Sequence, residues 1–98
     1  MMIDAHNHPD WHGYNLDKFL KNMQEHHIDR AWLLTWESPP DEYDPFYNYV
    51  MLLHERGPIP FERCLKYKEF APETFVLGYA PDPRRPEAID QLQAAIEI

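Results

Sequence analysis

The chain has 98 residues, of which 44% are hydrophobic and 27% charged, so we expect a soluble globular chain of at most one ordinary domain. Nine Lys and Arg against seventeen Asp and Glu give a net charge of −8, which argues against binding to nucleic acid or to an anionic membrane. A lone cysteine, Cys64, excludes an internal disulfide and a multi-cysteine zinc site. Neither a long apolar run nor a signal-peptide pattern is present, so we expect a cytoplasmic protein.

The first third of the chain predicts a strand–helix–strand unit. Met2–His6 is apolar-biased and precedes turn residues, which indicates a first strand. Asn15 is a typical helix cap, and the helix should end near His26-His27. Ala31–Thr35 is continuously apolar, which is typical of a strand covered on both faces. The helix should bury one face, made by residues at the spacing i, i+3, i+4 and i+7: Leu16, Phe19, Leu20 and Met23. Two strands joined by a helix predict parallel pairing through a right-handed crossover.

The remainder repeats the pattern of helices and strands. The predicted elements are a helix after Asp44-Pro45 that carries Phe46 to His54 at helical spacing, a helix over Pro60–Ala71, a strand over Thr74–Tyr79 and a helix from Ala88. Because three parallel strands leave sheet edges uncovered, we expect an α/β fold that is an incomplete (β/α)8 TIM-type barrel. Residues 1–98 would be the N-terminal part of that single domain, truncated in the helix after strand three. The alternative is a complete three-stranded miniature domain.

The segment His6-Asn7-His8 is the main candidate for chemistry. Side chains at i and i+2 of a strand share a face, so two imidazoles at the end of an inner strand can reach one cation. Neutral imidazole is a good ligand for zinc and neighbouring metals. The carboxyl ends of strands are also where α/β folds collect ligands. The sequence therefore predicts a divalent metal site, against the alternative of two surface loop histidines.

The stretch Ile3-Asp4-Ala5-His6-Asn7-His8-Pro9 resembles the opening strand of the amidohydrolase superfamily. The closest branch is the amidohydrolase-related proteins, which are metal-dependent hydrolases and non-oxidative decarboxylases built on a (β/α)8 barrel. Residues 75–87, Phe-Val-Leu-Gly-Tyr-Ala-Pro-Asp-Pro-Arg-Arg-Pro-Glu, are similar to the third strand of that branch and its following Asp-Pro loop.

This resemblance implies that His6 and His8 are metal ligands, with zinc as the expected cofactor. The other ligands of the family, histidines on middle strands and a late aspartate, match no position in the chain. The implied activity is hydrolysis by metal-activated water, although these 98 residues alone should be inactive. A decarboxylase of the same family and a non-catalytic fragment or interaction module remain the alternatives.

Several further residues could support such a site. Asp4 lies two residues before His6 and could orient its imidazole, or make a hydrogen bond unrelated to metal. Asp10 or His12 could lend a third contact to the metal, although exposed loop residues are the commoner case. A group of residues follows predicted strand ends, where they could wall a pocket for a small-molecule substrate or simply pack in loops: Trp11, Trp36, Glu37, Tyr79 and Asp82. Cys64 should be a small buried hydrophobe. A homo-oligomer is left open.

Overall fold

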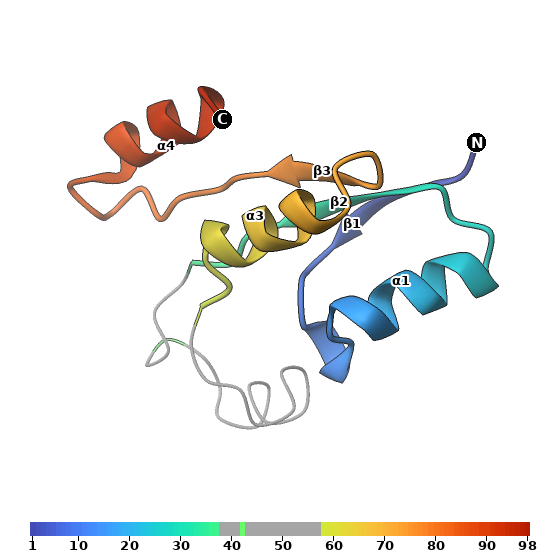
Figure 1. Cartoon of the computed structure of the whole chain (residues 1–98). Coiled ribbons are helices and arrows are strands. Elements are labelled where there is room, and N and C mark those ends of the chain that lie inside the picture. The colour runs from blue at the N-terminus through green and yellow to red at the C-terminus, as the bar shows by residue number, and fades with distance from the viewer. Residues whose placement is uncertain (38–41, 43–57) are drawn as a thin grey trace.

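The computed structural model describes residues 1–37, 42 and 58–98, and in these it has an α/β fold around one parallel sheet (Figure 1). Its elements are β1 (Ile3–Asn7), the 3₁₀ turn η1 (Trp11–Gly13), α1 (Leu16–Glu25), β2 (Arg30–Leu34), α3 (Phe61–Phe70), β3 (Phe75–Gly78) and α4 (Ala88–Ile96). The strands lie in the order β1-β2-β3, and both pairs are parallel. The predicted strands, the parallel pairing and three of the helices are confirmed, whereas the helix predicted after Asp44 lies outside the described residues.

The first helix forms where the sequence provides an N-cap. The side chain of Asn15 accepts a hydrogen bond of 3.0 Å from the backbone N–H of Lys18, which satisfies a donor that has no partner within the helix. The helix ends at Glu25, and His27 takes a left-handed conformation with φ of 56°. The chain can then turn back into β2, antiparallel to the helix it has just left.

Helices α1 and α3 cover the same face of the sheet, and the hydrophobic core lies between them and the strands. Edge-to-face contacts join Phe19 of α1 to Tyr67 of α3 and to Phe75 of β3, with ring centroids 5.9 and 5.5 Å apart. Cys64 is completely buried in this layer, and burial raises the pKa of its thiol to about 12. The expectation of a small buried hydrophobe at this position is confirmed.

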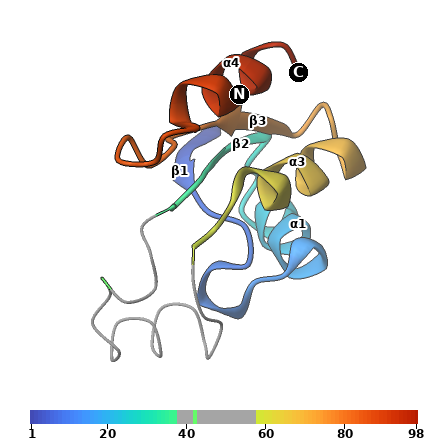
Figure 2. The same ribbon diagram turned by 90° about the vertical axis from the view of Figure 1, so that its left-hand side faces the viewer.

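The opposite face of the sheet is largely uncovered in the described part of the chain. Trp32 in the middle of β2 is 43% exposed, whereas its neighbours Ala31 and Leu33 are fully buried. The expectation that β2 would be covered on both faces is therefore wrong for the described residues. The physical reason is that α1 and α3 pack on one side only, while α4 lies beyond β3 and away from both (Figure 2). A continuous apolar run does not reveal which of its two faces is covered.

Helix α4 presents apolar side chains to solvent. Ile89 and Ile96, two turns apart on the same face of the helix, are 74% and 76% exposed. Trp32 is a further large apolar side chain that is exposed in the described part of the chain. In the described residues, no helix is long and apolar enough to cross a membrane.

We predict that the chain associates through this exposed surface. Replacing Ile96→Glu should raise the dissociation constant for self-association about tenfold or more, because burying an isoleucine side chain contributes about 1.5–3 kcal/mol. Ala94→Glu, which places the same charge on another face of α4, is the matched control. Sedimentation equilibrium measures both constants, and equal constants for the two variants would contradict the prediction.

Candidate functional site

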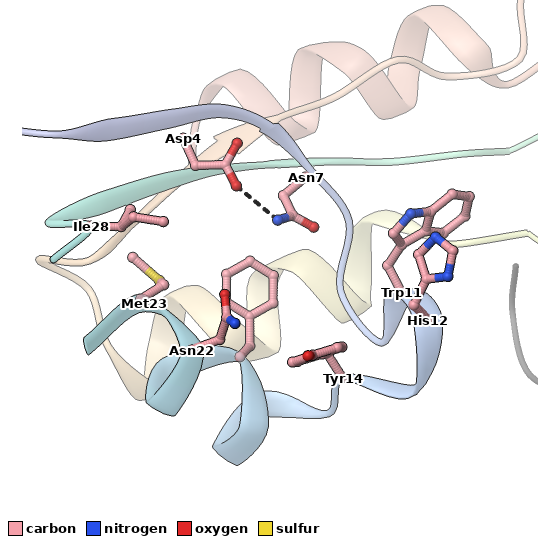
Figure 3. Close-up of a pocket in the computed structure, with 9 residues that line it drawn as sticks. Asp4, Asn7, Trp11, His12, Tyr14, Asn22, Met23 and Ile28 are labelled. Atoms are coloured by element: carbon pink, nitrogen blue, oxygen red, sulfur yellow. Dashed lines mark hydrogen bonds between the residues drawn. The ribbon is translucent and has the colours of Figure 1, made fainter. Parts of the chain in front are cut away.

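A bulge near the end of β1 sets the geometry of the candidate site. Asp4 is paired with Ala31 and Asn7 with Leu33, so three steps along β1 match two steps along β2. The carboxylate of Asp4 accepts hydrogen bonds from the backbone N–H of His6 (3.1 Å) and from the side-chain amide of Asn7 (2.8 Å). The extra residue therefore turns the strand, and the side chains of Asp4 and Asn7 lie together on the side of α1 (Figure 3).

His8 is buried, with 9% of its surface exposed, and both its backbone and its ring are held. The side chain of Asn7 accepts a hydrogen bond from the backbone N–H of His8 at 2.8 Å. The ring nitrogen Nδ1 of His8 lies 2.7 Å from the backbone oxygen of Leu34, at the end of β2. Since a carbonyl oxygen can only accept, the hydrogen belongs on Nδ1, and Nε2 of the neutral ring keeps its lone pair. The pKa of His8 is lowered, chiefly because burial disfavours the charged imidazolium.

The imidazole of His6 lies beside that of His8. Their ring centroids are 5.4 Å apart and the rings are nearly perpendicular, while His6 itself is exposed. The strand that carries them is not the inner strand we expected, because β1 is an edge of the described sheet and pairs there with β2 alone. Because His6 is exposed, its ring can be reached from solvent.

Two tryptophans enclose the buried side of this histidine pair. Trp11 follows β1 and Trp36 follows β2, and their rings lie 4.9 and 5.9 Å from the ring of His8. The two indoles are 5.6 Å apart. Trp36 is fixed by a backbone bridge to Ile59, which precedes α3, with N···O distances of 2.9 and 2.6 Å. Of the three aromatic residues predicted to wall a pocket, these two come together.

Tyr79, the third of those aromatic residues, lies elsewhere. Its ring packs against Phe61 with centroids 4.7 Å apart, and its hydroxyl lies 3.2 Å from Oε1 of Glu37 and 3.4 Å from Oε1 of Gln91. Burial, followed by the nearby charge of Glu37, raises the pKa of Tyr79. Tyr79 thus fastens the end of β3 to α4 and to the segment after β2.

The residues considered as further metal contacts have other partners. Asp10 accepts a hydrogen bond from the hydroxyl of Tyr67 (2.9 Å) and lies 3.7 Å from the guanidinium of Arg63. His12 packs edge-on against Trp11 at 5.3 Å. The carboxylate of Asp4 binds the backbone of His6 rather than its ring. In the part of the chain that the structure describes, no three His, Cys, Asp or Glu side chains are grouped to hold a metal.

Two pockets adjoin the strand ends. One of about 390 Å³ lies between the segments that follow β2 and β3, and Trp36, Glu37 and Asp82 all line it. The other, of about 310 Å³, lies between β1 and α1, and Trp11 lines it. His6 and His8 line neither of these two pockets. Sequence reasoning missed Asn7 and the carbonyl of Leu34, which fix His8; Asn7 could have been noticed as an amide next to a strand end.

The comparisons with known proteins give no match. No family model, no curated protein and no solved structure matches this chain.

The hydroxyl of Tyr67 ties the loop after β1 to α3, so its removal should destabilise the fold. It accepts a hydrogen bond from the backbone N–H of Asp10 (3.0 Å) as well as donating to that residue's carboxylate, and Tyr67 is almost fully buried. Tyr67→Phe should lower the free energy of unfolding by about 1–3 kcal/mol, because the backbone N–H and the carboxylate oxygen of Asp10 would both lose their bond to the hydroxyl. Tyr14→Phe, at an exposed ring, should change it by less than about 0.5 kcal/mol. Urea titration measures both, and equal effects would contradict the prediction.

Asp82 should make stability depend on acid pH. Hydrogen bonds from the guanidinium (2.9 and 2.8 Å) and the backbone N–H (3.0 Å) of Arg84 lower the pKa of Asp82 from its ordinary value of 3.8 to about 2. A carboxylate with a depressed folded-state pKa stabilises the fold above pH 3.8, and this contribution is lost as the pH falls towards 2.

Asp82→Asn should therefore lose less stability than the wild type between pH 4 and pH 2. Asp90→Asn, at an exposed acidic position on α4, is the control. Urea midpoints measured across this pH range provide the test. Parallel pH profiles for Asp82→Asn and the wild type would be inconsistent with the role assigned to Arg84.

Proposed function

We propose that this chain is the N-terminal part of a metal-dependent hydrolase of the amidohydrolase type, with His6 and His8 as ligands of a divalent metal, most simply zinc. The observation that carries the proposal is the pair of neighbouring imidazoles at the bulged end of β1, where the Leu34 carbonyl holds Nδ1 of His8 and leaves Nε2 to coordinate. A metal-binding histidine typically donates its other ring hydrogen to such a carbonyl.

The two imidazoles are ligands of a type that zinc commonly binds. Two imidazoles supply two of the three protein ligands of a typical catalytic zinc site. The remaining ligands would come from other strands of the proposed barrel. A bound metal of this kind acts as a Lewis acid that activates water and polarises a carbonyl.

The residues of this chain would contribute orientation and shielding. The Leu34 carbonyl fixes the tautomer and direction of His8, and Asn7 fixes its backbone. Trp11 and Trp36 cover the buried side of His8 and keep water from it there. Trp36 also lines the pocket between the segments after β2 and β3, which is where a small-molecule substrate would approach.

The strand order supports the barrel part of the proposal. Consecutive parallel strands in the order β1-β2-β3, with α1 and α3 on one face, are the arrangement of a singly wound barrel. The uncovered face that carries Trp32 would then be the inside of the barrel. We further propose a cytoplasmic location, because Cys64 is a free buried thiol in a chain with no second cysteine.

Zinc titration of the purified chain tests the metal site. Isothermal calorimetry should detect binding to the wild type, and His8→Ala should weaken it at least tenfold, since even losing an outer partner of a metal ligand costs about 10–100-fold. His6→Ala should act in the same direction. The His26→Ala/His27→Ala double variant removes two histidines from an exposed helix end and should leave the affinity unchanged.

A wild-type chain that binds no zinc, or a loss of binding in the His26/His27 control equal to that in His8→Ala, would refute the proposed site. Ring NMR signals of His6 and His8 that shift together with zinc would place both ligands on one ion.

A second candidate is a non-catalytic interaction module. The observation in its favour is the exposure of large apolar side chains on two elements, Trp32 of β2 and Ile89 and Ile96 of α4. A chain that binds no zinc but self-associates through α4 would favour this candidate over the hydrolase.

A further inference from the structure

The pocket between β1 and α1 is separate from the histidine pair and has the features of a small-ligand site (Figure 3). Its volume of about 310 Å³ is at the lower end of the range of about 300–1,000 Å³ that ligand pockets occupy. Polar groups reach it from both elements: Asp4 and Asn7 from β1, and Asn22 from α1. Aromatic rings make up much of its remaining wall: Trp11, Tyr14 and Phe19.

The charge of this pocket is negative. Of the residues that the structure describes around it, Asp4 is the one carboxylate, none is lysine or arginine, and the exposed imidazole of His12 is the one basic side chain. Asp4 is half-buried, and each of its oxygens accepts one hydrogen bond from β1, which leaves lone pairs for another donor.

Two carboxylates that line other pockets of the described chain have a cation beside them. Asp10 is next to Arg63 and Asp82 is next to Arg84, whereas no such partner accompanies Asp4 in the described residues. A partly desolvated carboxylate without a positive neighbour attracts a cation more strongly than one that is already paired.

The aromatic walls narrow the class of cation. Aromatic faces favour apolar groups and organic ammonium groups, and they are not ligands for a metal ion. Asn22 adds an amide oxygen across the pocket from Asp4, which could accept a second hydrogen from an ammonium group. The composition therefore suits a molecule with one ammonium end and one apolar or aromatic end.

We propose that the pocket between β1 and α1 binds a small primary ammonium compound with an aromatic or apolar body, its nitrogen hydrogen-bonded to Asp4 and its body packed between the rings of Trp11, Tyr14 and Phe19. This site is distinct from the histidine pair proposed above to hold a metal, because neither His6 nor His8 lines it.

Calorimetric titration with three probes that share a phenyl ring on a two-carbon chain tests the proposal. The probes are 2-phenylethylammonium, the neutral 2-phenylethanol and the anionic 3-phenylpropionate. The ammonium probe should bind with a dissociation constant of about 1 mM or below, and about tenfold more tightly than the alcohol, because a charge-assisted hydrogen bond is roughly twice as strong as a neutral one. The carboxylate probe should show no binding.

Two variants and one control locate the site. Asp4→Asn should weaken the ammonium probe about tenfold by removing the charge. Asn22→Phe leaves the hydrogen bonds of Asp4 intact and fills the pocket from α1, so it should abolish binding and decide the matter even if Asp4→Asn does not fold. Asp17→Asn, which removes the same charge from an exposed position of α1 outside this pocket, should leave binding unchanged.

Equal affinities for the ammonium and the alcohol would overturn the proposal. Unchanged binding in Asn22→Phe, or an equal loss in Asp4→Asn and Asp17→Asn, would also overturn it. Binding of 2-phenylethylammonium that persists when His6 and His8 are replaced by alanine would support its independence from the metal site.

Discussion

The histidine pair and the pocket between β1 and α1 both depend on the hydrogen bonds that the carboxylate of Asp4 accepts. By accepting hydrogen bonds from the backbone of His6 and the amide of Asn7, it stabilises an extra residue in β1. The bulge directs Asn7 towards α1, which completes one wall of the pocket there. It also brings the next residue, His8, to the carbonyl that ends β2. A regular strand would not present these two neighbouring residues in the same way.

The two sites share one wall. The indole of Trp11 packs against the ring of His8 on one side and lines the pocket between β1 and α1 on the other. The loop that carries this indole is held by the hydrogen bonds between Asp10 and Tyr67. Helix α3, which carries Tyr67, therefore supports the position of Trp11. The buried hydroxyl of Tyr67 is therefore satisfied both as a donor and as an acceptor.

The sequence predicted the local features well and the long-range ones poorly. The Asn15 cap and the apolar periodicity of residues 16–23 specify α1 within the segment itself, so its bounds could be read directly. The spacing i, i+2 predicted that the rings of His6 and His8 would be neighbours, and they are. The backbone conformation differs from the prediction, because the strand is bulged between Asp4 and Asn7 and does not alternate regularly there. The same bulge places Asp4 beside Asn7 instead of beside an imidazole.

Other features lie beyond any local pattern. The contact of Tyr67 with Asp10 joins residues 57 positions apart, and nothing in either segment indicates the pairing. The exposure of Trp32 depends on which side the helices pack, and an apolar run is the same for both outcomes. The family resemblance rests on short motifs at the two ends of the chain, and its metal ligands remain a proposal.

The burial of Cys64 has a practical consequence. The thiolate is the form that reacts with alkylating reagents, and a thiol with a pKa of about 12 inside the core scarcely forms it at neutral pH. Labelling at this position therefore requires α3 to lift away from the sheet. The rate at which Cys64 is modified therefore reports how often α3 separates locally from the sheet. Since α3 also carries Tyr67, the same rate reports on the support of the loop after β1.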